Sequence, residues 1–477
     1  MKVTHVKTYL LEHNGEIYTP DLKINQRGFY QEELEKVLKH DNSKNYNIIC
    51  VEEEVAKYNL CDSVCNCYGL DEEVFQYKLW KEAYLDNNLN GFSLPIIVNT
   101  NNEYRKEVEQ KLLEYVKYLE RPAFVYERST LECIKTECRL ILKAIDHLIH
   151  GNENNAEKII EQLLSLFIED PFLISDLDKS YSFRGIAPFI DLRSVGYDED
   201  YDKMMEMNLT FYRVRTRKVD DNENITDIEH ILHLPYNLKD KASSMRFSSA
   251  ALPGLYLGTT TYVCSEECKW NGEDELYASV FIPNSEGKKL KILNMTISQA
   301  LINGIYNRTH DGNNIVRRKL QNAMLKMFPL VIATSFSVKI EEKVKYQYLL
   351  SQALMRCASR IGIDGIAYLS MKGKDEFQYP QGVNLAIPAT DISEKNLYSE
   401  KCKGFMISKP VMYCRQEGKE RRSYINEVYK KQDKTGFESY ISKLNMGGEL
   451  KFYGDTSFGK FDNYLLKLPT SIRGVEP

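Results

Sequence analysis

Hydrophobic residues in the first part of the chain recur every three or four positions, the spacing of one face of an amphipathic helix. The pattern predicts helices over residues 31–39, 72–84, 103–119, 130–150 and 156–167. Gly151 begins the polar turn between the last two, and two helices joined by a short turn favour an antiparallel hairpin. A short apolar run at 46–51 has the character of a strand. We therefore expect a mainly helical N-terminal domain over residues 1–204.

Beyond residue 203 the pattern changes to short strands separated by turns. Apolar or alternating runs predict strands over residues 211–215, 255–257, 278–282, 289–293, 330–336 and 366–369, with helices over 317–327 and 346–361. This mixture predicts an α+β fold with a mixed or antiparallel sheet, which we assign to a second domain over residues 205–400. Residues 401–477 are charged and less periodic, so we interpret them as a C-terminal extension.

Composition and charge narrow the classes of function. The 477 residues include 63 Lys and Arg against 68 Asp and Glu, a formal net charge of −5. Without a global basic field, we do not expect nucleic-acid binding. The chain lacks a long uncharged apolar run and its first residues are charged, so we expect neither a membrane span nor a signal peptide. The 11 cysteines without a secretion signal are typical of reduced thiols in the cytoplasm, and the richness in Lys, Asn, Tyr and Ile is typical of an AT-rich bacterial genome.

Three cysteines, Cys61, Cys65 and Cys67, lie close enough in sequence to ligate a metal ion. Their C-x3-C-x-C spacing differs from the paired C-x2-C of a zinc ribbon, and no second cluster with histidine follows. Buried or helix-side cysteines are therefore the preferred interpretation. A structural zinc ion in a nucleic-acid sensor remains the alternative.

Five polar residues from four separated fragments carry the candidate chemistry: Arg213, Arg246, Tyr256, Glu267 and Ser370. Each alone is typical of a surface or core position. Together, two arginines near strand ends can hold a diphosphate through paired hydrogen bonds, and a tyrosine face can stack on a flat ring. A glutamate can stabilise an oxocarbenium ion, and a serine hydroxyl can orient a ribose or an amide. A diphosphate, an aromatic ring and a ribosyl cation together describe NAD⁺.

The order and spacing of these fragments resemble the RES domain family, which is named after an arginine, a glutamate and a serine. Its members look like ADP-ribosyltransferases in fold and are typically toxins that degrade NAD⁺ by hydrolysis or phosphorolysis. The resemblance covers about residues 205–390. Tyr212-Arg213 matches the family's opening YR motif, and Met245-Arg246-Phe247 matches its GR[FW] segment with Met in place of Gly.

The remaining motifs of the family contain the acid and the hydroxyl. Its LYL strand is centred on Tyr256, and Glu267 follows by the expected 11 residues, which favours Glu267 over Glu266. Its motif dGI-x-Y-x-S ends at Ser370, and its closing NL strand begins at Asn384. The chain departs from the family in a long acidic insert between the two arginines and in about 100 residues between the glutamate and the serine.

The resemblance implies a site that takes NAD⁺ as its substrate and needs no metal. The residues implied in catalysis are Glu267, Arg213 and Ser370. The residues implied in binding NAD⁺ are Arg213, Arg246, Tyr256, Ser370 and Asn384. Two alternatives remain open: an ADP-ribosyltransferase that modifies a macromolecule, and a catalytically silent sensing or binding protein.

Small RES toxins usually pair with a separate helix-turn-helix antitoxin, whereas here the domain follows a large helical region, as in RES proteins fused to HEPN-like domains. That arrangement implies an effector of anti-phage defence or stress, and an antitoxin or trigger protein that binds the helical region; homo-oligomers are compatible with it. The nuclease signature of HEPN helices is an Arg with a His a few residues later, but Arg139 and His147 are eight residues apart. We therefore expect His147 and His150 at the surface near a helix end, in a regulatory domain.

Overall fold

The computed structural model describes most of the chain. The described residues are 3–13, 16–18, 47–56, 89, 91–120, 128–184, 208–221, 224–299, 301–302, 315–340, 344–372, 382–413, 443–446, 449–453 and 456–473. The chain divides into two compact units, Met1–Leu89 and Asn90–Pro477.

The first unit contains a small antiparallel sheet. Its strands, in the order β2–β1–β3, are β2 (Glu16–Tyr18), β1 (Val3–His13) and β3 (Asn47–Ala56). The strand predicted over 46–51 is thus confirmed, and it extends further. Several sequence predictions lie outside the described residues: the helices over 31–39 and 72–84, and Cys61, Cys65 and Cys67.

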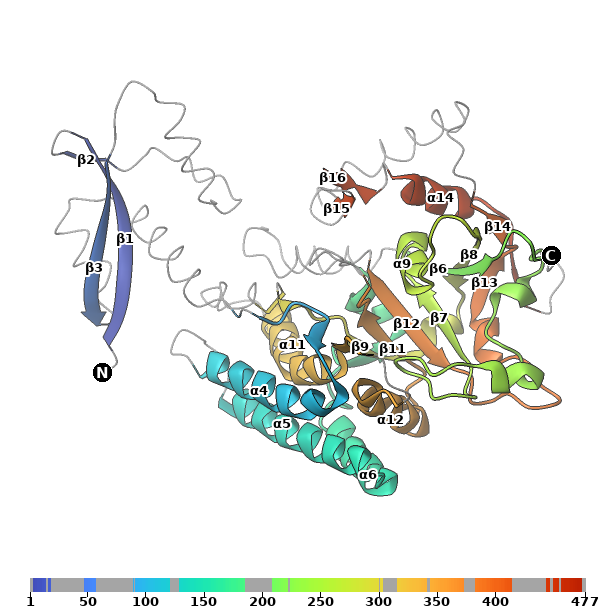
Figure 1. Ribbon diagram of the computed structural model, residues 1–477, viewed down its shortest axis with the longest axis horizontal. Coiled ribbons are helices and arrows are strands. Elements are labelled where there is room, and N and C mark those ends of the chain that lie inside the picture. The colour runs from blue at the N-terminus through green and yellow to red at the C-terminus, as the bar shows by residue number, and fades with distance from the viewer. Residues whose placement is uncertain are drawn as a thin grey trace. The chain divides into compact units, whose positions relative to one another are not determined.

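Three helices at the start of the second unit form a layer: α4 (Asn101–Leu119), α5 (Arg128–Ile149) and α6 (Glu153–Ser165). They confirm the helices predicted over 103–119, 130–150 and 156–167, and α5 packs against both neighbours (Figure 1). The three- and four-residue spacing of apolar positions predicted these helices because each helix buries one stripe of apolar residues. Arg105 Nε donates to Asp146 Oδ1 at 2.6 Å and ties α4 to α5.

Two further helices, α11 (Ile315–Thr334) and α12 (Tyr346–Arg360), pack both on this layer and on strands of the main sheet. They confirm the helices predicted over 317–327 and 346–361. The strand predicted over 330–336 is wrong for most of its length, because residues 330–334 continue α11. A strand, β10 (Phe336–Val338), begins only afterwards and pairs in parallel with β4 (Ile96–Val98).

A proline inside α11 leaves one helix carbonyl without its usual donor, and a residue from another helix supplies a replacement. Pro329 has no N–H, so the carbonyl of Leu325 lacks the donor that lies four residues on in an ordinary helix. The buried Tyr115 of α4 supplies a replacement, since its hydroxyl donates to Leu325 O at 2.9 Å. Tyr104 likewise donates to Ala333 O, in the last turn of α11, at 2.8 Å. The partners of these carbonyls therefore come from α4, and α11 continues through a residue that ends many helices.

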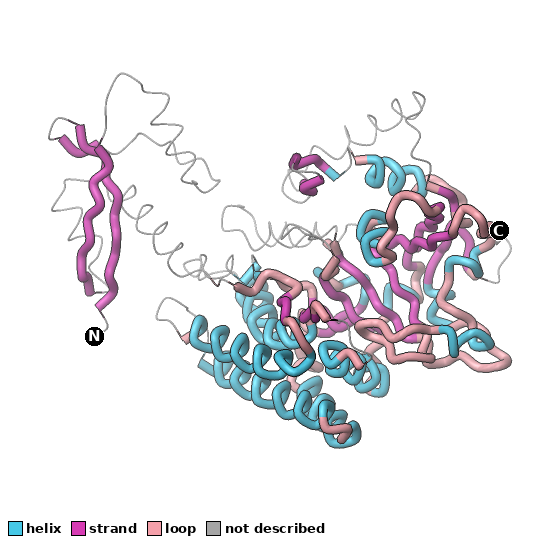
Figure 2. Tube along the Cα trace, in the orientation of Figure 1, coloured by secondary structure: helices cyan, strands magenta, loops and turns pink. Residues whose placement is uncertain are grey.

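The centre of the second unit is a mixed sheet of 10 strands. β9 and β11 run parallel and the other pairs are antiparallel. The combination of helices with this mixed sheet, seen in Figure 2, confirms the predicted α+β fold. In spatial order the strands are β17 (Thr470–Ile472), β13 (Phe405–Ser408), β8 (Glu275–Pro283), β6 (Phe211–Arg217), β7 (Gly254–Gly258), β12 (Val383–Pro388), β11 (Gly365–Leu369), β9 (Lys291–Met295) and β5 (Ile174–Asp176), with β14 (Val411–Met412) beside β8. The other five predicted strands are therefore confirmed, although β9 lies two residues later than expected.

Alternation along the strands gives this sheet two buried faces. On β6, Phe211 packs in one cluster with Leu257 and Phe281, whereas the next residue, Tyr212, packs in a second cluster with Val263 and Phe458. The period of two is that of a strand whose neighbouring side chains point to opposite faces. The second face is covered by two short helices, α9 (Thr261–Glu267) and α14 (Ser457–Leu465).

The main sheet draws strands from all three predicted domains. β5 precedes residue 204, and β13 and β17 follow residue 400. The expected boundaries at 204/205 and 400/401 therefore do not coincide with the compact unit, which runs from Asn90 to Pro477. The extension also contains an antiparallel pair, β15 (Lys443–Met446) and β16 (Glu449–Phe452). Within the described parts of the chain, no helix combines the length and the apolar character needed to cross a bilayer.

Candidate functional site

Glu267 is the last residue of α9, a helix of 7 residues that folds back on the strand before it. Thr260 caps the start of α9, with its Oγ1 accepting from Val263 N at 3.1 Å. Gly258 at the end of β7 permits the close approach, since a Cβ there would lie 2.6 Å from Cys264 Sγ and from Val263 Cγ1. The carboxyl end of α9 consequently lies beside β12, the strand that pairs with β7.

The Glu267 carboxylate is held by two side chains from neighbouring strands. Its Oε1 accepts from Ser370 Oγ at 2.8 Å and from Asn384 Nδ2 at 2.8 Å. Ser370 directly follows β11, Asn384 lies in β12, and both are 4% exposed. Among the described residues, only Oε1 of this half-buried carboxylate is hydrogen-bonded, so Oε2 retains its capacity to accept.

Arg246 lies beneath this cluster and is 7% exposed. Its guanidinium donates to Leu369 O at 3.1 Å, to Thr334 O at 2.9 Å and to Ser335 Oγ at 2.7 Å. It therefore joins the end of β11, one residue before Ser370, to the end of α11. Within the described residues no carboxylate pairs with it, and burial lowers its pKa.

Two aromatic rings enclose the Arg246 guanidinium. Its central carbon lies 5.1 Å from the ring centroid of Phe247 and 5.0 Å from that of Tyr368. The two rings contact each other with centroids 4.7 Å apart. Because an arginine is attracted to the face of an aromatic ring, these contacts partly offset the loss of hydration around the buried charge.

Arg213 on β6 and Tyr256 on β7 contact each other. Arg213 Nη1 donates to the main-chain oxygen of Tyr256 at 2.9 Å, and its Nη2 lies 3.5 Å from Leu232 O. The Tyr256 hydroxyl shares a hydrogen bond of 2.6 Å with Ser248 Oγ. Burial raises the pKa of Tyr256 to about 12 and lowers that of Arg213. Tyr256 is thus a neutral hydroxyl at neutral pH.

The structure brings the predicted residues together to different degrees. Glu267, Ser370 and Asn384 share direct hydrogen bonds, although the chain separates them by 103 and 117 residues. Arg246 reaches this group through the main-chain oxygen of Leu369, the residue before Ser370, whereas Arg213 donates to the main-chain oxygen of Tyr256. Two contributors were not singled out from the sequence, Ser248 and Tyr368. Tyr368 lies within one of the motifs and Ser248 directly follows another, but a motif does not show which side chains touch.

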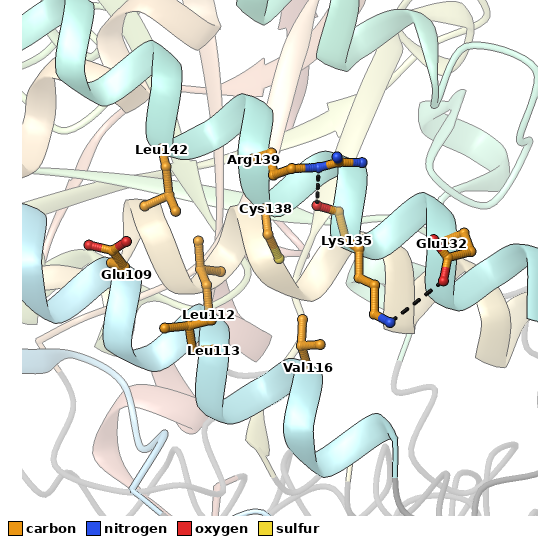
Figure 3. Close-up of a pocket in the computed structure, with 9 residues that line it drawn as sticks. All are labelled: Glu109, Leu112, Leu113, Val116, Glu132, Lys135, Cys138, Arg139 and Leu142. Atoms are coloured by element: carbon orange, nitrogen blue, oxygen red, sulfur yellow. Dashed lines mark hydrogen bonds and ion pairs between the residues drawn. The ribbon is translucent and has the colours of Figure 1, made fainter.

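The N-terminal helices carry a separate pocket of about 370 Å³ between α4 and α5. Figure 3 shows an apolar floor with charged residues at its rim; the lining residues are Glu109, Leu112, Leu113, Val116, Glu132, Lys135, Cys138, Arg139 and Leu142. Arg139, considered above for nuclease chemistry, donates to Lys135 O at 3.3 Å. His150 is exposed and His147 is half-buried at the end of α5, close to the surface position expected for them.

Metal ligation has no candidate in the described ranges, where no three His, Cys, Asp or Glu side chains gather around a common point. Comparison with known families finds no family model that matches the chain. A protein of Bacillus subtilis (strain 168) named "Putative toxin YopC" is 25% identical over 376 residues, which cover 72% of this chain and 81% of that protein. No solved structure matches. The chain is thus a distant relative of a protein named as a toxin.

Proposed function

We propose that this protein is a toxin-type effector that degrades NAD⁺ by cleaving the bond between nicotinamide and ribose. The observation that carries the proposal is the position of the Glu267 carboxylate. Its Oε1 accepts hydrogen bonds from Ser370 and Asn384, and its Oε2 accepts none from the described residues, so Oε2 is available to a substrate. The two nearby arginines without a carboxylate partner among the described residues add the positive charge that a dinucleotide requires. The likeness to a protein named as a toxin supports the effector role.

The chemistry needs little from the protein beyond binding and charge stabilisation. The C–N glycosidic bond breaks, its electron pair leaves with nicotinamide, and positive charge develops on the ribose as an oxocarbenium ion. Nicotinamide is already cationic in NAD⁺, so it departs neutral without taking a proton. Water then adds to the ribose and releases one proton to give ADP-ribose, or phosphate adds in its place. Glu267 Oε2 would face the developing cation, where a carboxylate stabilises the transition state.

The two arginines would contribute in different ways. Arg246 already donates to three oxygens, so we assign it the placement of Ser370 and a long-range attraction for the diphosphate. Arg213 is the more accessible of the two and would contact the diphosphate directly. Tyr256 would pack on the nicotinamide–ribose half, and Ser370 and Asn384 would place the glutamate and hydrogen-bond the ribose or the amide.

The deciding experiment follows free nicotinamide after purified full-length protein is mixed with NAD⁺. Glu267→Gln should lower the rate by about 10²–10⁴-fold, because it removes the charge that acts in the transition state. The matched control is Glu266→Gln, which removes one carboxylate at the adjacent position and should keep most of the rate. Circular dichroism of all samples ensures that folded proteins are compared.

Two results would redirect the proposal. Release of nicotinamide with ADP-ribose attached to protein or nucleic acid, seen by mass spectrometry of a lysate, would identify a transferase. No release by the wild type, together with unchanged cellular NAD⁺ after induced expression, would identify a catalytically silent binding protein. Full activity in Glu267→Gln would reject the assigned role of this residue.

A further inference from the structure

The C-terminal extension reaches the candidate site through one buried carboxyl group. Asp462 lies within α14 and is 5% exposed. Its Oδ1 accepts from the Thr261 N–H at 3.1 Å and also from the Thr261 hydroxyl. Its Oδ2 accepts from the Tyr453 hydroxyl at 2.5 Å. Thr261 is the first residue of α9, so the extension holds the amino end of the helix that carries Glu267.

This contact matters because α9 is too short to hold itself in place. Its 7 residues span about 10 Å, and an isolated helix of two turns is unstable in water. Its position must therefore come from tertiary contacts. A tilt at Thr261 would be carried along the rigid helix to its other end, where Glu267 meets Ser370 and Asn384.

The extension contacts the same region at further points. The Tyr212 hydroxyl, next to Arg213 on β6, donates to the main-chain oxygen of Asp462 at 3.4 Å. Phe458 of α14 lies with its ring centroid 5.6 Å from that of Tyr262 in α9 and 6.0 Å from that of Trp270. α14 thus packs against both the strand that carries Arg213 and the helix that ends at Glu267.

We propose that the C-terminal extension is a working part of the candidate site, with Asp462 as a positioning residue that fixes α9 and so sets the place of Glu267. The catalytic consequence rests on the proposed NAD⁺ chemistry, whereas the anchoring rests only on the contacts with Thr261. The two carboxyl oxygens of Asp462 accept hydrogen bonds from Thr261 and from Tyr453. An asparagine keeps an acceptor for Thr261, and an alanine keeps none.

The test compares three variants of the full chain. Asp462→Ala should lower kcat for nicotinamide release by about 10- to 100-fold with little change in KM, because a misplaced catalytic group weakens transition-state binding more than substrate binding. Asp462→Asn should restore most of kcat. The control Leu465→Ala empties a fully buried position of the same helix. It should lower thermal stability but leave kcat within about 2-fold.

Hydrogen exchange supplies a readout that does not depend on catalysis. In Asp462→Ala the amides of α9 should exchange faster relative to those of β8. If the wild type releases no nicotinamide, the proposed function fails, and the exchange data alone decide whether Asp462 anchors α9. Unchanged exchange in α9, an unchanged kcat despite faster exchange, or an equal loss of kcat in Leu465→Ala would each overturn the positioning role.

Discussion

Removing a single hydroxyl, in Tyr115→Phe, should destabilise the second unit more than the loss of an ordinary hydrogen bond. The Tyr115 hydroxyl donates to Leu325 O, whose usual helical donor is missing because residue 329 is proline. The site is buried, so water does not replace the lost donor. A buried carbonyl left without a partner costs about 1–3 kcal/mol, and we expect a fall of about 2 kcal/mol in the free energy of unfolding.

The shape of the core should contribute little to that loss. The phenylalanine keeps the ring that packs edge-on against Phe328, with centroids 5.1 Å apart. Urea denaturation followed by circular dichroism measures the change. A loss of about 2 kcal/mol lowers the folding equilibrium constant about 30-fold.

A double-mutant cycle separates this explanation from a general packing defect. In a Pro329→Ala background, residue 329 regains an N–H that can donate to Leu325 O, so Tyr115→Phe should cost well under 1 kcal/mol. Tyr104→Phe is the control, because Ala333 O lies in the last turn and its partner does not depend on residue 329. Equal costs of Tyr115→Phe in both backgrounds would refute the reasoning.

Two further predictions concern stability. Burial raises the pKa of Asp462 from 3.8 to about 7, so between these pH values the folded chain keeps a proton that the unfolded chain releases. The free energy of unfolding should therefore fall by about 4 kcal/mol as pH rises from about 4 to about 7, and the fall should level off above that pH. Asp462→Asn lacks this titration, so a stability difference from wild type that is constant across this range would contradict the assignment. Arg246→Lys replaces a planar guanidinium, which donates to three oxygens, by an ammonium group that cannot reach all three. The free energy of unfolding measured by urea denaturation should fall by at least about 2 kcal/mol. Arg360→Lys, at a half-exposed ion pair with Glu161, should cost less than about 1 kcal/mol, and equal losses in the two variants would reject the special role of the buried arginine.

The parts of the fold that could be predicted are those whose signal is local. α4, α5 and α12 each carry their own apolar stripe, and β6 and β7 their own alternation, so periodicity identified them. The end of α11 could not be predicted, because Pro329 followed by branched residues favours a strand. The residue that donates to the carbonyl left without its usual partner is Tyr115, 210 positions from Leu325 in the sequence.

The residues of the candidate site also differ in whether the sequence pointed to them. Glu267, Ser370 and Asn384 were grouped from the order of short motifs along the sequence, which does not depend on the length of the insertions between them, and the three side chains do share hydrogen bonds. Asp462 could not be identified in this way, since it lies in a charged stretch with weak periodicity and meets Thr261 across 201 residues of chain. Contacts of that separation depend on how the sheet is assembled, and β13 and β17, which form one edge of that sheet, come from residues 405–408 and 470–472.

The anchoring of α9 from the far end of the chain also sets an order of events during synthesis. At about 5–20 residues per second, roughly 10–40 s pass between the synthesis of Thr261 and that of its partner Asp462. Throughout that interval the helix with Glu267 lacks the bond at its amino end, and the sheet lacks its last strand. A nascent or prematurely terminated chain that lacks residue 462 therefore carries an incomplete site, so the complete site forms only after this residue has been synthesised.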